Sequence, residues 1–323
     1  MRSTRVLYVA ITILLANGAG ALAQSWPSRP ISVVSVFSAG NATDTVARVV
    51  LDSVARELGQ AFVIENRPGG GGTIGVAAVA KAEPDGHTIL LHASTFSSQV
   101  VMHKTLPYDP VNDFTPVVLF GSQPLVLVVG TSKGFKTAAD LVAAAKAAPS
   151  SLNFASAGVG ATSHLAALRF IRAAGIDVQH IPFRGPTEAF TEVMAGRVDF
   201  FFLPMAPAIN LVKQGKIVAL AVSSVKRAPA LPDIPTTSEI GYPDAAFQFW
   251  AGLFLPAKTP RTIADKLHAA TMRALRLPAV SSRLSEMGVE PLPMSVDQFG
   301  TYFRDDLAAT VKLAKEAGIG PAN

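Results

Sequence analysis

The same tripeptide, Ser-Ala-Gly, stands at residues 38–40 and again at residues 156–158, and both copies share one local context. Each follows a short apolar run, at residues 31–36 and 152–155 respectively, and each leads into a pattern of helical periodicity. A strand that turns through small residues into a helix presents backbone N–H groups at the positive end of the helix dipole, where anions bind well. The two copies therefore predict one small anion held between two similar lobes.

Short apolar runs alternate with helical patterns along nearly all of the chain, which is typical of βαβ units. We therefore expect an α/β fold in which each lobe is a mostly parallel sheet flanked by helices. In the helix after the second tripeptide, Leu165, Leu168 and Ile171 share one face. Arg169 and Arg172 are accordingly expected to face water. Elsewhere we expect strands at residues 62–64, 88–91, 117–120, 125–129, 178–182, 198–203, 217–222 and 249–255, and helices at 263–275, 280–287 and 296–317.

Residues 1–23 have the pattern of a secretory signal peptide. Two arginines precede an apolar stretch at residues 6–16, and Ala-Leu-Ala at 21–23 forms a small-x-small cleavage site. This stretch is too short for a permanent membrane anchor. Cleavage between Ala23 and Gln24 predicts a mature chain exported to the periplasm; a retained interfacial helix is the alternative.

The composition excludes several classes of function. The chain has no cysteine, which excludes disulfides, thiol chemistry and cysteine-based metal sites. Its formal net charge is +5, and losing the two arginines of the leader would leave about +3. That charge is too weak and too scattered to indicate nucleic-acid binding, although it mildly favours anionic ligands.

The motifs of catalytic chemistry are incomplete. Gly-Val-Gly-Ala-Thr-Ser at 158–163 has serine where a dinucleotide-binding loop has its third glycine, and the four glycines at 69–72 lack the ending of a phosphate-binding P-loop. A Gly-x-Ser-x-Gly elbow is absent, and the six histidines show no metal-ligand spacing. We therefore expect no enzyme, no cofactor and no metal. The alternative is a periplasmic hydrolase built from Asp44, His164 and Ser163.

Three polar residues near the two tripeptides each have two interpretations. His164 falls in a first helical turn beside the predicted pocket, where it either contacts ligand or hydrogen-bonds locally. Asp44 either stabilises a helix dipole or accepts a hydrogen bond from the ligand. Arg184 follows a predicted strand and is either solvated or a partner for a carboxylate.

The chain is long enough for two lobes, each with its own core. We expect lobe 1 to comprise residues 24–123 and 249–323, and lobe 2 residues 124–248. The chain would cross near residues 123–124 and 249–250, because each tripeptide must lie in a different lobe to form opposite walls of one cleft. The C-terminal helices would pack back on lobe 1.

Seven motifs occur in the order found in one family: Pro-Ser-Arg-Pro-Ile at 27–31, Phe-Ser-Ala-Gly-Asn-Ala-Thr-Asp at 37–44, Glu-Asn-Arg-Pro-Gly-Gly-Gly-Gly at 65–72, Pro-Asp-Gly-His-Thr at 84–88, Gly-Val-Gly-Ala-Thr-Ser-His-Leu at 158–165, Ile-Pro-Phe-Arg-Gly at 181–185 and Trp-Ala-Gly-Leu at 250–253. Together they resemble the Bug (TctC-like) extracytoplasmic solute receptors of tripartite tricarboxylate transporters. Two departures stand out. The first loop lacks the family's usual second glycine and a hydroxyl, and Arg184 stands where relatives more often have lysine.

The resemblance implies a two-lobed periplasmic-binding-protein type II fold that closes on a small organic carboxylate, held largely by backbone amides and waters. It also implies delivery to the permease subunits of a tripartite tricarboxylate transporter; an orphan receptor that feeds a signalling partner is the alternative. A monomer is expected. Phe249 is a candidate for the far end of the pocket. The expected ligand-binding residues are Phe37, Ser38, Ala39, Gly40, Asn41, Thr43, Asp44, Ser94, Thr95, Gly158, Gly160, Ala161, Thr162, Ser163, His164 and Arg184.

Overall fold

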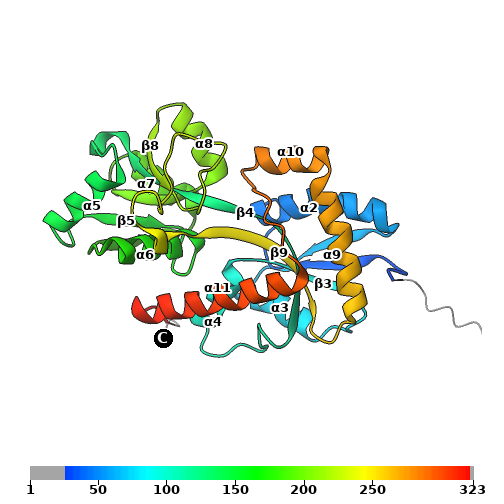
Figure 1. Ribbon diagram of the computed structural model, residues 1–323. Coiled ribbons are helices and arrows are strands. Elements are labelled where there is room, and N and C mark those ends of the chain that lie inside the picture. The colour runs from blue at the N-terminus through cyan, green and yellow to red at the C-terminus, as the bar shows by residue number, and fades with distance from the viewer. Residues whose placement is uncertain (1–25, 321–323) are drawn as a thin grey trace, which may run out of the picture.

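The computed structural model describes residues 26–320, so the predicted signal peptide lies outside the described residues. The described chain forms an α/β protein of two lobes, which lie at opposite ends of the molecule (Figure 1). Two long strands, β4 (Phe114–Gly130) and β9 (Gln248–Pro256), connect the lobes, and β4 pairs with strands of both sheets. The α/β class expected from the alternation of strands and helices is confirmed.

Lobe 1 is built on a sheet with the strand order β2-β1-β3-β9-β4. Its further elements are β1 (Ile31–Ser35), β2 (Phe62–Asn66), β3 (Thr88–Ala93), α2 (Ala42–Leu58), η1 (Gly70–Gly72), α3 (Thr73–Ala80), α4 (Thr95–Met102), α9 (Arg261–Arg276) and α10 (Pro278–Glu286). Side chains of a strand alternate between the two faces of its sheet. In β1, Ile31 and Val33 therefore enter the core formed with α2, α9 and α10, whereas Val34 enters the core formed with α3 and α4.

Lobe 2 is built on a second sheet, in which β4 is followed by β7, β5 and β6, with β8 on the other edge of β4. Its further elements are η2 (Thr131–Lys133), α5 (Ala138–Ala147), β5 (Asn153–Ser156), α6 (Thr162–Ala174), β6 (Gln179–Pro182), α7 (Pro186–Met194), β7 (Phe200–Pro204), α8 (Met205–Lys213), β8 (Ile217–Val222) and η3 (Pro243–Ala245). Phe200 and Phe202 enter the core under α5 and α6, and Phe201 enters the core under α7 and α8.

Each sheet combines parallel strands with antiparallel crossing strands. β1, β2 and β3 are parallel in lobe 1, and β5, β6 and β7 are parallel in lobe 2. β4 and β9 pair antiparallel with each other and with their other neighbours. The reason is geometric, because β4 carries the chain into lobe 2 and β9 returns it to lobe 1.

The strands expected at residues 117–120 and 125–129 are one strand, β4. It pairs with β9 as far as Pro124 and with β7 and β8 from Leu125 onward. Gly121 interrupts the apolar pattern because the backbone of the segment after α10 lies against it. A Cβ there would meet the carbonyl oxygen of Glu290 at 2.6 Å. The change of partner at Pro124 places the junction of the two sheets in the middle of β4.

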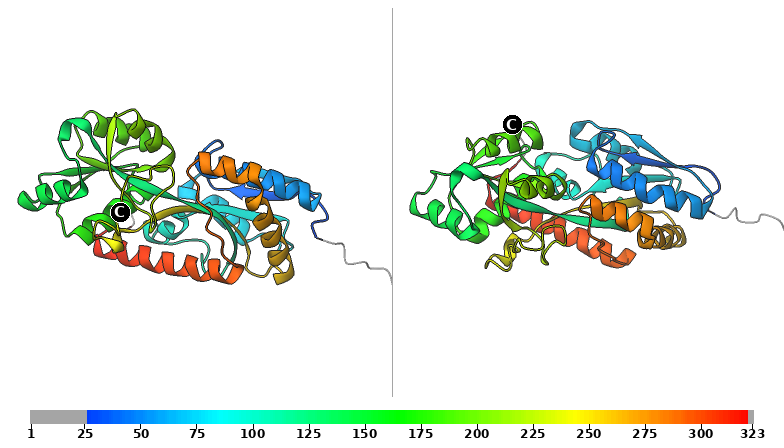
Figure 2. Two further views of the ribbon diagram at one scale, coloured as in Figure 1. Left: turned by 45° about the horizontal axis from the view of Figure 1, so that its top comes forward. Right: turned by 90° about the horizontal axis from the view of Figure 1, so that it is seen from above.

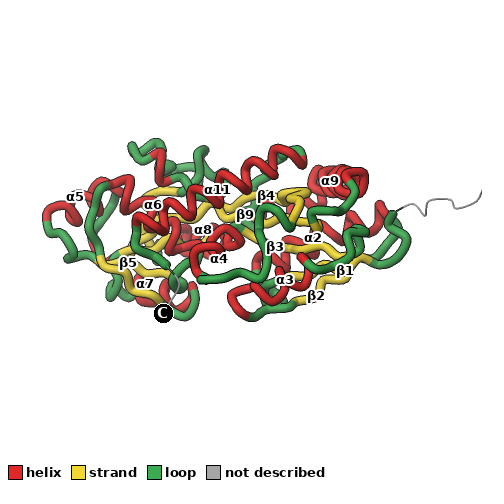
Figure 3. Tube along the Cα trace, turned by 90° about the horizontal axis from the view of Figure 1, so that it is seen from below, coloured by secondary structure: helices red, strands yellow, loops and turns green. Residues whose placement is uncertain are grey.

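The last helix, α11 (Val296–Glu316), contacts both lobes. Figures 2 and 3 show it lying along one side of the molecule across β4 and β9, with α6 near one end. Phe299 and Phe303 near its start belong to a core of lobe 1, whereas Leu313 near its end belongs to a core of lobe 2. α11 thus packs on lobe 1, where the C-terminal helices were expected, and it reaches lobe 2 as well.

The expectation that Arg169 faces water is wrong. Its side chain is 19% exposed, lies 3.8 Å from the carboxylate of Asp306 in α11, and stacks over Phe247. Arg172 is half exposed, as expected, and forms an ion pair with Glu316. Helical periodicity could not distinguish these two arginines, because the helix that covers Arg169 comes from the far end of the chain.

Candidate ligand-binding site

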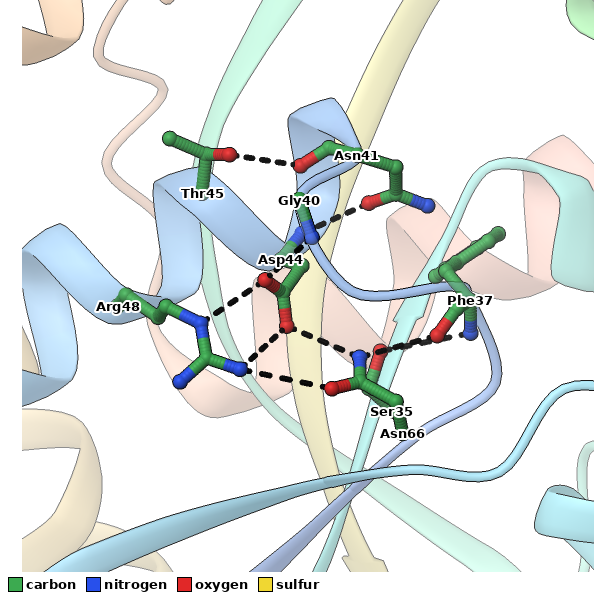
Figure 4. A network of polar contacts seen from close by, with 8 residues as sticks. All are labelled: Ser35, Phe37, Gly40, Asn41, Asp44, Thr45, Arg48 and Asn66. Carbon is green, nitrogen blue, oxygen red and sulfur yellow. Dashed lines mark hydrogen bonds and ion pairs between the residues drawn. The ribbon is translucent and has the colours of Figure 1, made fainter.

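The first Ser-Ala-Gly loop, residues 37–44, is held by hydrogen bonds within lobe 1 (Figure 4). Asn41 is the N-cap of α2, and its Oδ1 accepts the N–H of Asp44 at 2.9 Å. The carboxylate of Asp44 accepts the N–H of Gly40 at 2.9 Å. The side chain of Asn66 donates to the carbonyl of Phe37 and to Asp44, both at 3.0 Å. The amides of Gly40 and Asp44 are therefore already used inside the protein.

The charge of Asp44 is compensated by Arg48, one helical turn later. Arg48 donates two hydrogen bonds to the carboxylate, at 2.9 and 3.1 Å. Burial alone would raise the pKa of Asp44, but hydrogen bonds from Arg48, Asn66 and Gly40 outweigh it and hold the pKa below its usual value. Asp44 is thus a buried, ionised carboxylate that organises the loop, which agrees with the local interpretation of this residue.

The second Ser-Ala-Gly loop, residues 156–164, is also organised from within. The N–H groups of Ala157, Gly158 and Gly160 donate to Ser163 Oγ at 3.0 Å, Ser156 Oγ at 3.1 Å and His164 Nδ1 at 3.1 Å, respectively. Gly158 and Gly160 have φ values of 115° and 77°, a region that favours glycine. These two glycines therefore let the loop fold back onto the start of α6.

The N-terminus of α6 differs from that of α2 in its cap. Its N-cap residue is Ala161, which has no side-chain acceptor, and no side chain caps the helix. Among residues 26–320, nothing accepts the N–H groups of Thr162, Ser163 or His164. The first N–H groups of a helix have no partner inside it and point out of its end. This end of α6 therefore offers three adjacent donors, together with the positive end of the helix dipole.

His164 is a structural residue of the loop. Because its Nδ1 accepts the N–H of Gly160, this nitrogen carries no proton. Its ring stacks on that of His180, with ring centroids 4.1 Å apart. Burial, with a smaller effect of the charge on His180, lowers the pKa of His164 to about 3. His164 is therefore neutral and locally bonded, as the second of its two interpretations predicted.

His180 holds the second loop in place, and the sequence analysis did not single it out. Its Nε2 lies 2.6 Å from Ser156 Oγ, and burial lowers its pKa. It stacks on Phe154 as well as on His164, so it fixes the rear of the second loop. No spacing signal links it to the loop, because the register between β5 and β6 brings it there.

A cavity of about 210 Å³ opens where β4 and β9 cross between the lobes. The first turn of α6 forms one wall, and the N-terminus of α2 reaches it through Ala42. The lining is Ala42, Gln123, Pro124, Leu125, Ala157, Ala161, Thr162, Ser163, Pro186, Phe201, Pro204 and Phe249. Two of the three adjacent donor residues of α6, Thr162 and Ser163, therefore lie at the wall of an inter-lobe cavity, and His164 follows them in the same helical turn.

Four of the residues singled out from the sequence line this cavity: Ala161, Thr162, Ser163 and Phe249. Arg184 is exposed and lies outside the lining, and its backbone N–H donates to Glu188 at 3.2 Å. Ser94 is 3% exposed, and its hydroxyl has no partner within the described part of the chain. The other expected residues outside the lining are Phe37, Ser38, Ala39, Gly40, Asn41, Thr43, Asp44, Thr95, Gly158, Gly160 and His164, and their contact with ligand stays a prediction.

The lining residues that the sequence analysis missed are Gln123, Pro124, Leu125, Pro186, Phe201 and Pro204, with the two alanines 42 and 157. Most are apolar residues of β4 and β7 or of the first turns of α2 and α7, and they look like ordinary core residues in a sequence. In the described chain, no group of three or more acidic or histidine side chains could hold a metal ion. No helix within residues 26–320 is long and apolar enough to cross a membrane.

Two α/β lobes joined by two strands, with a cavity at the junction, define a two-lobed solute-binding protein of the periplasmic type. The comparisons agree. The family model described as "Tripartite tricarboxylate transporter family receptor" (TctC) matches residues 46–319. Protein BugT of Bordetella pertussis is 31% identical over 322 residues, which cover 98% of this chain and 99% of BugT.

Two solved structures are similar over almost their whole length. The R. palustris protein Rpa4515, solved with adipate, is 31% identical with a TM-score of 0.78, covering 92% of this chain and 100% of that one. MatC of Rhodopseudomonas palustris, solved with bound malate, is 32% identical with a TM-score of 0.74, covering 89% and 99%. The chain belongs to the tripartite tricarboxylate transporter receptor family.

Proposed function

We propose that this receptor captures one small organic carboxylate in the cavity between its lobes and delivers it, in the periplasm, to a membrane permease of the tripartite tricarboxylate transporter type. The observation that carries the proposal is the bare N-terminus of α6. Thr162 and Ser163, whose backbone N–H groups are unpaired in the described residues, lie at the wall of the inter-lobe cavity with the positive end of the helix dipole, and such an arrangement binds anions. The adipate and malate bound by the two relatives are carboxylates and support the same class of ligand.

The two lobes enclose the ligand-binding site from opposite sides. Residues 24–123 and 249–323 form lobe 1 and residues 124–248 form lobe 2 in this proposal, because β4 changes partners between Pro124 and Leu125. Closure brings the N-terminus of α2, through Ala42, against a carboxylate already seated on α6. A ligand enclosed in this way loses contact with water, and its charge then interacts more strongly with the backbone dipoles.

The arrangement supports binding without turnover. A hydrolase built from Asp44, His164 and Ser163 would need these side chains to hydrogen-bond one another. In the described residues, each is bonded elsewhere: Asp44 to Arg48, His164 to Gly160, and Ser163 to Ala157. None of the three carries the partner that would activate it.

Titration calorimetry with carboxylates and their matching carboxamides tests the proposal. A carboxamide has the same shape but no charge, so the uncapped N-terminus of α6 should bind the acid at least tenfold more tightly than the amide. Product analysis of the same samples should recover the acid unchanged. Equal affinity for acid and amide would refute anion capture, and conversion of a bound acid would refute binding without turnover.

A further inference from the structure

From the lining of the inter-lobe cavity we infer the class of acid that this chain takes: a monocarboxylate with an apolar body, in preference to a dicarboxylate. The inference rests on the proposed function, because it assumes that a carboxylate binds at α6. It differs from the ligands of the two solved relatives, because adipate and malate both carry two carboxylates.

The unpaired hydrogen-bond donors among the lining residues come from one element. That element is the first turn of α6, with the amides and hydroxyls of Thr162 and Ser163. The rest of the wall is apolar: Pro124 and Leu125 from β4, Phe201 and Pro204 from β7, and Phe249 from β9 with Pro186 from α7. The single polar residue of this lining outside α6 is Gln123, and its amide already donates to the carbonyl of Met287 at 2.6 Å.

The residues that line the cavity include no lysine, arginine or histidine. The cations that follow the two loops are not available. Arg48 is committed to Asp44 by two hydrogen bonds. Arg169 lies against Asp306 of α11, and Arg184 is exposed outside the lining. A second carboxylate on the ligand would therefore lose its hydration against proline, leucine and phenylalanine side chains without gaining a partner. A methyl group or an aromatic ring at the same position gains from burial instead.

The size of the cavity limits the apolar body. A volume of about 210 Å³ is smaller than the roughly 300–1,000 Å³ of pockets that bind drug-sized ligands, so the cavity suits a small acid. Hexanoate and benzoate are small acids of this kind, and both place a carboxylate at one end of an apolar body.

Titration calorimetry with matched pairs tests the inference on the whole mature protein. Hexanoate and adipate share one six-carbon chain and differ in having a methyl group or a second carboxylate at its end; benzoate and terephthalate form the aromatic pair. We expect each monoacid to bind at least tenfold more tightly than its diacid. Along acetate, butyrate and hexanoate, affinity should rise about three- to fourfold per methylene, as burial of apolar surface predicts.

The outcomes separate the inference from the proposed function. A diacid that binds as tightly as its monoacid overturns the inference and leaves carboxylate capture in place. Binding of hexanamide as tightly as hexanoate, in contrast, overturns carboxylate capture itself. Absence of binding by all of the acids also overturns the inference, because it commits to acids of this size.

A variant tests the physical reason. Pro186 is exposed at the start of α7 and lines the cavity, so an arginine there adds a cation to the apolar wall without replacing a core residue. Pro186→Arg should tighten adipate binding relative to hexanoate by at least fivefold, whereas the uncharged control Pro186→Gln should leave the ratio as it is. An unchanged ratio in Pro186→Arg would overturn the explanation that the missing cation excludes diacids.

Discussion

Replacing Ala161 by aspartate should stabilise the protein and at the same time abolish its binding of carboxylates. Ala161 has the extended backbone of an N-cap residue, with φ −65° and ψ 157°, but no side-chain acceptor. An aspartate at this position accepts an N–H of the first turn, as Asn41 does at the start of α2. The gain in the free energy of unfolding should be about 0.5–2 kcal/mol, the usual value of replacing alanine at an N-cap.

The aspartate side chain of Ala161→Asp also blocks the carboxylate-binding site at the start of α6. It occupies donors that the ligand needs and places a negative charge where the ligand's carboxylate would lie. A ligand carboxylate that loses two hydrogen bonds, at about 1.5–3 kcal/mol each for charged groups, loses about 3–6 kcal/mol of binding free energy. This corresponds to a loss of affinity of roughly 10²- to 10⁴-fold.

The assay combines chemical unfolding with titration calorimetry of the best-binding acid. Ala161→Asn is the matched control, because it supplies a cap of the same shape without the charge and should weaken binding less than Ala161→Asp. Wild-type affinity in an Ala161→Asp protein whose stability has risen would contradict the reasoning. The cap would then be formed, and the anion would have to be bound elsewhere.

Three further predictions concern Gly160, Arg184 and His164. Gly160→Val should abolish binding, because Gly160 has φ 77° and a Cβ there would meet the side chain of Met102 at 3.0 Å. The control Gly134→Val has the same backbone strain, at φ 76°, in open space, so it should lose about 1–2 kcal/mol of stability and keep its affinity; loss of binding in both would point to unfolding. Arg184→Ala should change the affinity for any acid less than twofold, because Arg184 lies outside the cavity; a larger loss, measured by calorimetry, would place it at the ligand. His164, with its pKa lowered from 6.5 to about 3 by burial and by His180, stabilises the fold above pH 6.5 and loses this contribution as the pH falls towards 3. Stability should therefore fall by about 1.4 kcal/mol per pH unit below 6.5 through this group, and His164→Gln should flatten the thermal unfolding profile between pH 7 and 5; an equal slope in both proteins would assign the loss to other groups.

Local signals predicted the strands and helices because these depend on periodicity within a few residues. The pattern of Leu165, Leu168 and Ile171 located α6, and the two Ser-Ala-Gly loops were recognised from their strand–loop–helix context. The residues that organise the second loop, Ser163 and His164, also lie within the motif that carried the family resemblance. The sequence could thus predict only the part of the site that is formed by contiguous residues.

The rest of the site depends on contacts between distant segments. The sequence left two interpretations of Asp44 open, because its local partners include Asn66 of the next strand as well as Arg48 of its own helix. Phe201 and Pro204 reach the cavity because β7 pairs with β4, and no sequence pattern fixes that register. The same applies to Arg169, which α11 covers from the other end of the chain.

In the proposed function, the backbone N–H groups at the start of α6 hold the ligand. Amide proton and nitrogen chemical shifts, recorded by NMR during titration with hexanoate, report on these groups one by one. We expect the largest downfield proton shifts at Thr162, Ser163 and His164, whose N–H groups are unpaired in the described structure, and a far smaller change at Gly40, which is already bonded to Asp44. Saturable binding with unchanged shifts at residues 162–164 would show that these N–H groups do not hold the ligand.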